Sequence, residues 1–177
     1  MMKKMLSVAL CLLVVCFCLL PAFGLEDCGT ISVRLNSDVA GRTKNDVQAL
    51  FALQSGNVTY GIRGGEPIQI ADYGGTEETG RLVAGRTYTV SYTLSAADGY
   101  VLPQQLDDNN LQISCGKGVS VISRAIVSAR VRTDDGSFDE IRGVRIFAKL
   151  TVDGNVFQRF IGRIHDLILK AKAWSLY

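Results

Sequence analysis

The residues that could perform acid–base or nucleophilic chemistry are few in this chain of 177 residues. His165 is the only histidine. A Ser–His–Asp or Cys–His catalytic site needs a histidine as its base, and a zinc site of cysteines and histidines needs several such ligands. We therefore interpret His165 as a residue on a helix surface, and we expect a protein that is not an enzyme, with no catalytic residues and no bound metal.

Carboxylates gather in two short segments that we expect to be turns. The segments contain Asp107, Asp108, Asp134, Asp135, Asp139 and Glu140. Oxygen-rich loops can bind calcium, but this spacing matches no defined calcium loop, and Asp-Gly pairs are what hairpin turns require. The sequence also identifies no two of these carboxylates as the catalytic pair that a glycosidase holds in a cleft. We interpret the acids as solvated turn residues and expect no cofactor.

Three tyrosines are the weak candidates for contact with a ligand. Tyr60, Tyr73 and Tyr100 lie near expected turns, where an exposed ring could stack on a sugar. The alternative is that these rings simply pack at strand ends, as tyrosines often do.

The N-terminus has the layout of a secretory signal peptide. Lys3 and Lys4 precede an apolar run over residues 5–20, and Pro21 and a small-x-small site ending at Gly24 follow it. This pattern predicts a signal peptide over residues 1–24, cleaved after Gly24. We expect a secreted or surface-associated protein, although the same run could serve as a membrane anchor if it were retained.

Cleavage would leave two cysteines, Cys28 and Cys115. Two cysteines in an exported chain most often pair. The disulfide would close a loop of 88 residues (115 − 28 + 1), which in the chain-entropy model adds about 4–5 kcal/mol of stability. We expect this disulfide, with two free thiols as the alternative.

The charge of the chain beyond residue 24 is balanced but unevenly distributed. Without Lys3 and Lys4 it has 17 positive and 17 negative residues, so we expect no nucleic-acid partner. From Gly154 onward four positive residues stand against Asp166, which makes the tail +3 and the body −3. The 153 residues left after cleavage (177 − 24) suffice for one domain with a substantial core.

Apolar residues alternate with polar ones along most of the body, which is typical of strands with one buried face. The clearest strand is Arg86–Ser95, where Tyr88 and Tyr92 belong to the face that we expect to be buried. Further strands are expected at residues 31–35, 57–63, 67–71, 111–115, 127–131 and 144–152. Residues 46–54 fit a strand or one helical turn, and we favour the strand. About seven strands without intervening helices predict an antiparallel β-sandwich over residues 25–153.

The run from Ala84 to Pro103 resembles a signature of Ig-like modules in secreted and surface proteins of Gram-positive bacteria. It reads Ala-Gly-Arg-Thr-Tyr-Thr-Val-Ser-Tyr-Thr-Leu-Ser-Ala-Ala-Asp-Gly-Tyr-Val-Leu-Pro, and Ile31–Leu35 followed by Val39-Ala-Gly is similar to the opening strand of such modules. The resemblance covers approximately Ile31 to Val152. It implies an Ig-like β-sandwich with a binding or spacer role and no shared catalytic residues.

The period changes after Asp153, and residues 154–177 predict an amphipathic helix. Asn155 is a suitable N-cap with Gln158 three residues later, as in a capping box. Apolar residues fall within an arc of about 140° and basic residues on the opposite side. The candidates for contact with a membrane or partner are Phe157, Phe160, Ile161, Ile164, Leu167, Ile168 and Trp174, together with Arg159, Arg163 and Lys170.

These patterns together favour a secreted or surface-associated, non-catalytic binding or adhesion module. The terminal helix would attach it to a membrane, an envelope or a partner, and the partner could be a protein, a glycan or a second copy. The alternative for the helix is that its apolar side packs against its own domain, since a +3 helix beside a −3 body is electrostatically favourable. The alternatives are a small extracellular enzyme that acts on glycans, or a structural subunit that self-associates through edge strands and the tail.

Overall fold

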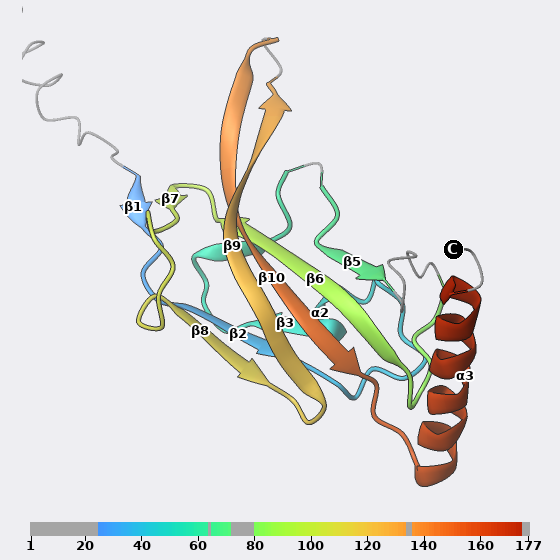
Figure 1. The fold of residues 1–177 in the computed structure, drawn as a ribbon. Helices are drawn as coiled ribbons and strands as arrows, with labels where there is room; N and C mark the ends of the chain where they lie inside the picture. Colours follow the sequence, from blue (N-terminus) through green and yellow to red (C-terminus); the bar gives the residue numbers. More distant parts are fainter. Residues whose placement is uncertain (1–24, 64, 72–79, 134–135, 175–177) are drawn as a thin grey trace, which may run out of the picture.

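The computed structural model describes residues 25–63, 65–71, 80–133 and 136–174 (Figure 1). The predicted signal peptide, Tyr73, Asp134 and Asp135 lie outside the described residues. The side chains of His165, Lys170 and Trp174 lie outside them as well.

The described chain consists mainly of strands and ends in one long helix, which confirms the expected β-rich body and terminal helix. Ten strands are present where about seven were predicted. They are β1 (Glu26–Asp27), β2 (Ile31–Leu35), β3 (Phe51–Leu53), β4 (Val58–Tyr60), β5 (Ile68–Ala71), β6 (Thr87–Ala96), β7 (Tyr100–Val101), β8 (Leu111–Cys115), β9 (Val119–Arg132) and β10 (Phe138–Thr151). The helices are α2 (Val47–Leu50) and α3 (Val156–Trp174).

The strands form one large sheet and two smaller ones. The five-stranded sheet runs β4-β6-β10-β9, with β5 also paired to β6, and the three-stranded sheet runs β3-β2-β8. β2 pairs with β8 in parallel, with Ile31 opposite Leu111 and Leu35 opposite Cys115. β1 and β7 are also parallel. The prediction that all pairs are antiparallel is therefore wrong, because alternation defines the face of a strand but not its direction relative to a distant partner.

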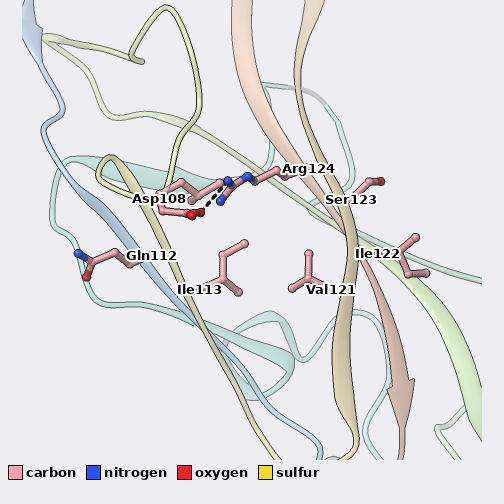
Figure 2. Close-up of a pocket in the computed structure, with 8 residues that line it drawn as sticks. Asp108, Gln112, Ile113, Val121, Ile122, Ser123 and Arg124 are labelled. Atoms are coloured by element: carbon pink, nitrogen blue, oxygen red, sulfur yellow. Dashed lines mark hydrogen bonds and ion pairs between the residues drawn. The ribbon is translucent and has the colours of Figure 1, made fainter.

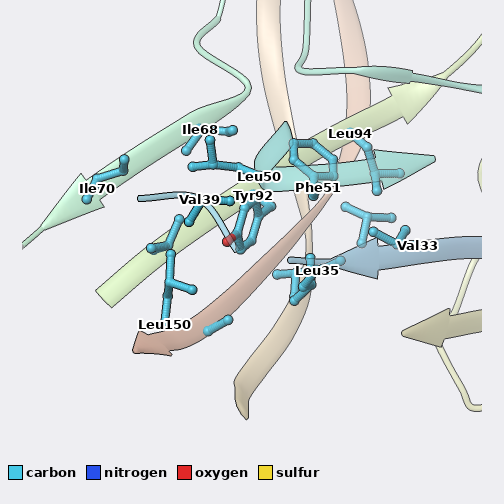
Figure 3. Packing of buried hydrophobic residues seen from close by; sticks show 14 of the residues in the cluster. Val33, Leu35, Val39, Leu50, Phe51, Ile68, Ile70, Tyr92, Leu94 and Leu150 are labelled. Atoms are coloured by element: carbon cyan, nitrogen blue, oxygen red, sulfur yellow. The ribbon is translucent and has the colours of Figure 1, made fainter. Parts of the chain in front are cut away.

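A single hydrophobic core lies between the five-stranded and three-stranded sheets (Figure 3). Tyr88 and Tyr92 of β6 are at most 1% exposed, as their alternation predicted. β10 and β2 add residues that are equally buried. They are Val144, Ile146, Ala148 and Leu150 from β10, and Ile31, Val33 and Leu35 from β2.

Residues 46–54 combine the two structures that their sequence allowed. One turn of helix, α2, is followed directly by β3, so the prediction of a strand throughout is wrong. The Asp46 carboxylate accepts a hydrogen bond from the Thr43 amide at 3.0 Å, and the Asp46 carbonyl accepts one from the Leu50 amide at 3.2 Å. The turn places both Leu50 and Phe51 in the core.

β9 and β10 form a long hairpin that extends past the body (Figure 1). Residues 143–150 of β10 lie between β6 and β9, whereas residues 138–142 pair with β9 alone. The register shifts between Phe147 and Ala148, which leaves Ile122 of β9 as the extra residue of a β-bulge. This bulge breaks the alternation, so the sequence predicted only part of β9.

α3 begins with the capping box that the sequence predicted. The Asn155 amide donates to Gln158 Oε1 at 2.9 Å, and the Gln158 amide donates to Asn155 Oδ1 at 2.8 Å. The first turn of the helix docks on the loop at Gly85, whose φ of +83° favours glycine. A Cβ on Gly85 would overlap the backbone of Gln158 and Arg159. The absence of a side chain at this position therefore allows α3 to approach the body.

Candidate functional site

α3 presents its apolar residues to solvent from its first turn onward. Phe157, Phe160, Ile161, Ile164, Leu167 and Ile168 are all between 40% and 71% exposed. Val156, before them, is 81% exposed. The structure thus keeps six of the seven apolar contact candidates uncovered, and the side chain of the seventh, Trp174, is outside the described part.

The basic candidates on α3 are also at the surface. Arg159 and Arg163 are exposed, and Arg159 Nε donates a hydrogen bond to the Gly154 carbonyl at 2.8 Å. This bond ties Arg159 to the start of the helix. α3 therefore combines an apolar stripe and cationic residues on a helix that lies beside the body in Figure 1.

Contiguous exposed apolar residues of this extent mark an interaction surface in soluble proteins. Neither α2 nor α3, as far as the chain is described, is long and apolar enough to cross a bilayer. An amphipathic helix of this kind can instead lie along a lipid surface, or pack against an apolar protein surface.

The tyrosine candidates do not form a flat exposed platform. The Tyr60 ring packs edge-to-face against Phe51 with centroids 5.0 Å apart, and its hydroxyl accepts a hydrogen bond from the Leu53 amide at 3.3 Å. Tyr100 is half-buried and packs against the core. Both tyrosines line one cleft of about 1060 Å³ beside Arg63 and Arg142, so the structure brings Tyr60 and Tyr100 together but commits much of Tyr60 to packing.

The predicted disulfide is not formed, because Cys28 and Cys115 are both free thiols. Cys115 lies opposite Leu35 at one end of the β2–β8 pair, and Cys28 precedes the other end at Ile31. Four residues of strand span about 13 Å, whereas a disulfide needs Cα atoms within about 7 Å. The loop-length argument failed because it considered the entropy of closing the loop and not the strand register.

Burial shapes the chemistry of both thiols. Burial and the Asp27 carboxylate raise the pKa of Cys28, partly offset by a backbone hydrogen bond. Burial also raises the pKa of Cys115, and a hydrogen bond from the Val121 amide partly offsets this effect. A thiol with a raised pKa forms little thiolate at neutral pH and is a weak nucleophile.

Asp107 and Asp108 serve in a turn and an ion pair. The prediction that Asp139 and Glu140 lie in a turn is wrong, because both lie in strand β10, where they line the cleft beside Tyr60. Asp107 Oδ1 accepts hydrogen bonds from the amides of Asn109 at 2.9 Å and Asn110 at 3.0 Å, and Asp108 forms an ion pair with Arg124 at 2.7 Å. Within the described ranges, no three His, Cys, Asp or Glu residues are grouped so that they could hold a metal ion.

A groove between β8 and β9 is the feature that sequence reasoning missed (Figure 2). It has a volume of about 510 Å³, and Ile113 and Val121 lie between the two strands. Its charged residues are Arg124 and Asp108, which pair with each other. No sequence pattern marks it, because β8 and β9 belong to two different sheets.

Comparison with known proteins adds no relative: no family model, no curated protein and no solved structure matches the chain.

Proposed function

We propose that the protein is a secreted or surface-associated, non-catalytic binding module that attaches to an anionic membrane surface through α3. The proposal includes export by the signal peptide at residues 1–24 and an Ig-like relationship of the body, for which the resemblance at Ala84–Pro103 is the support.

The observation behind the proposal is the contrast in burial within one chain. The core residues of β6 and β10 are at most 1% exposed, while the apolar stripe of α3 is at least 40% exposed. Each fully buried large apolar side chain gains about 1.5–3 kcal/mol. The six exposed side chains of α3 forgo this gain in the isolated chain, and they would obtain it when another surface covers them.

A lipid surface and a second copy could each cover the stripe. A second copy would bring a body of charge −3 to the +3 tail and could bury the apolar stripe. An anionic bilayer would take up both faces, since the stripe enters the acyl region and each nearby cation gains about 1 kcal/mol from anionic headgroups.

The test is co-sedimentation of the chain with vesicles of phosphatidylcholine, with and without phosphatidylglycerol. We expect binding that requires the anionic lipid and that weakens with salt. Phe160→Ala should lower the partition coefficient about tenfold, because roughly 1.4 kcal/mol of apolar burial is lost.

The matched control is Phe138→Ala, which removes a phenylalanine of similar exposure, 67% against 59% for Phe160, from the β9–β10 hairpin. It should leave vesicle binding unchanged. Equal binding of both variants, or no binding by the parent chain, would overturn the proposal. A dimer that Phe160→Ala dissociates in the absence of lipid would identify a second copy as the occupant instead.

A further inference from the structure

β10 has a free edge where the long hairpin continues past the end of β6 (Figure 1). The last pair between these two strands is Ser95 with Gly143, and in the described chain residues 138–142 pair with β9 alone. The cleft of about 1060 Å³ opens at this point, because residues 95–102 line one side of it and residues 139–142 line another. The cleft therefore occupies the place where β6 would continue if it were longer.

Main-chain hydrogen bonds show which way each residue of β6 points. The Gly61 amide donates to the Thr93 carbonyl at 2.7 Å, and the Thr93 amide donates to the Pro67 carbonyl at 2.7 Å. The main chain of Thr93 thus faces away from β10. Because the direction alternates along a strand, the main chain of the next residue, Leu94, faces β10, where Val144 lies opposite it.

The same direction recurs at every second residue of β10. The register of β10 with β9 has no shift between residues 138 and 147, so Arg142 and Glu140 direct their amides and carbonyls to the same side as Val144. On that side the pairing with β6 ends at Gly143. The main-chain groups of Arg142 and Glu140 are therefore directed into the cleft. Extended peptides bind proteins by adding a strand to a free edge of this kind.

The side chains at this edge differ between the two faces of the hairpin. A Cβ on Gly143 would lie 2.6 Å from Ile62 Cδ1, and Ile141, two residues before Gly143, is on the same face. Ile62 and Ile141 both line the cleft, and Ile141 is half-buried. Arg142 and Glu140 are exposed on the opposite face. One face of the edge is thus apolar and the other is charged.

We infer that the cleft accepts an extended segment of a partner protein, which adds antiparallel to β10 in the line of β6 and reads acid, apolar residue, base. The acid lies opposite Arg142, the apolar residue opposite Ile141, and the base opposite Glu140. Cross-strand pairs of apolar residues and of opposite charges stabilise a sheet. This surface is separate from α3, and the inference does not depend on membrane attachment.

The order of the charges along the edge selects this sequence. Arg142 is nearest to the end of β6, and its Nη2 donates to the Gln104 carbonyl at 3.3 Å. A guanidinium has five N–H donors, so Arg142 can also bind a carboxylate. Glu140 lies nearer to the hairpin tip, with Arg130 opposite it in β9. Asp139, next to Glu140, adds a second carboxylate at the end where the base of the segment would lie.

A second copy of β10 would match these charges but not the available space. β10 itself reads Glu140-Ile141-Arg142, so two copies paired antiparallel at Ile141 would place opposite charges together. In that register Asp139 of the second copy would lie opposite Gly143, where Ser95 of β6 already pairs. The edge is thus protected against pairing with itself, and it suits a segment whose extended part begins beside the end of β6.

The first experiment measures the binding of a fluorescent peptide with the core Glu-Val-Lys to the whole chain without lipid, by anisotropy. The dye is at the C-terminal end of the peptide, because the N-terminal end would lie beside β6. The control peptide has the core Lys-Val-Glu, which keeps the composition and reverses the order of the charges. We expect Glu-Val-Lys to bind about tenfold more tightly, because both charge pairs change sign in the control.

The main-chain pairing has its own test. N-methylation of the lysine amide removes a donor that would face β10, and it should weaken binding about tenfold. N-methylation of the valine amide, which would face away from β10, should change affinity little. In the protein, the bound peptide should slow amide hydrogen exchange at Glu140 and Arg142 and leave Ile141, which faces β9, nearly unchanged.

An exchange of the two charges in the protein provides the decisive comparison. The double variant Glu140→Arg, Arg142→Glu should prefer Lys-Val-Glu about tenfold. Both side chains are exposed, so the fold should tolerate the exchange. The control Lys149→Glu reverses an exposed charge on the same strand outside the cleft, and it should keep the preference of the parent chain.

Three results would overturn the inference. One is no saturable binding of the Glu-Val-Lys peptide, and another is the same peptide preference in the parent chain and the double variant. The last is a dimer in light scattering with slowed exchange at Glu140 and Arg142, because it would assign this edge to a second copy.

Discussion

β6 and α3 are both rich in apolar residues, but the fold uses them in opposite ways. Every core-facing residue of β6 from Tyr88 to Leu94 is at most 1% exposed, whereas the apolar stripe of α3 faces water. β6 has β10 on one side and β4 and β5 on the other. α3 touches the body through its first turn at Gly85. Apolar pattern alone therefore does not indicate whether a segment serves folding or binding.

The difference lies in what each segment contributes to the free energy of unfolding. Burial of β6 contributes to folding directly, while the stripe of α3 contributes only when another surface covers it. Pairs of substitutions can test whether the core contributes to folding and α3 only to binding. Each pair compares two residues of the same type in different environments.

The largest expected effect compares two phenylalanines. Phe51→Ala should lower the free energy of unfolding by about 3–5 kcal/mol, because Phe51 is fully buried against Tyr60 and Tyr92. Phe157→Ala, at a position 71% exposed, should change it by less than about 0.5 kcal/mol. Urea denaturation monitored by circular dichroism measures both, and similar losses would mean that α3 is part of the core in solution.

The next effect concerns the docking of α3. Gly85→Ala should cost about 1–2 kcal/mol for its positive φ and should also displace the first turn of α3, since its Cβ would overlap Arg159. Gly99→Ala is the control, because Gly99 has a φ of +85° but no atom within 4 Å of an added Cβ. Limited proteolysis should then cut α3 faster in Gly85→Ala alone. Equal cleavage of the two variants would show that α3 does not dock at Gly85.

The smallest effect compares two buried tyrosines on the same face of β6. Tyr88→Phe should destabilise the protein by about 1 kcal/mol, because the Tyr88 hydroxyl accepts a hydrogen bond from the Val83 amide at 3.0 Å. Tyr92→Phe should be neutral or stabilising, because the buried Tyr92 hydroxyl has no hydrogen-bond partner in the described structure.

Tyr92 should also make the stability of the protein depend on pH in alkaline solution. Burial, and then the nearby Cys115 sulfur, raise the pKa of Tyr92 well above its usual value. The unfolded chain loses this proton near pH 10 while the folded chain retains it, so stability should fall as the pH rises above about 10. Thermal unfolding of Tyr92→Phe at increasing pH should show a smaller decline. If Tyr92→Phe loses as much stability as the parent chain, the loss at high pH comes from other titratable groups.

The sequence predicted local features accurately and distant ones poorly. Residues 31–35 and 111–115 were predicted as strands with the bounds that β2 and β8 have, and the capping box of α3 was visible as Asn155 and Gln158. Alternation and capping depend on neighbours within a few residues. The parallel pairing of β2 with β8 and the separation of the cysteines depend on contacts about 80 residues apart, which no local pattern encodes.

The candidate surfaces divide in the same way. The stripe on α3 followed from a helical period that the sequence displays. The groove at Ile113 and Val121 could not be predicted, because it arises where the edges of two sheets meet. In addition, the bulge at Ile122 interrupts the alternation of apolar and polar residues, so that only part of β9 is recognisable as a strand in the sequence.

The pairing of β2 with β8 also bears on when the chain can fold. β2 is made early, but its parallel partner ends at Cys115, and β6 lacks β10 until residue 151 has been synthesised. Contacts between distant segments form slowly, because long loops must close first. The N-terminal half alone therefore has no complete sheet to collapse onto. A nascent chain of this topology would remain without a complete sheet until nearly all of it has emerged, and this late folding would be compatible with the export that we propose.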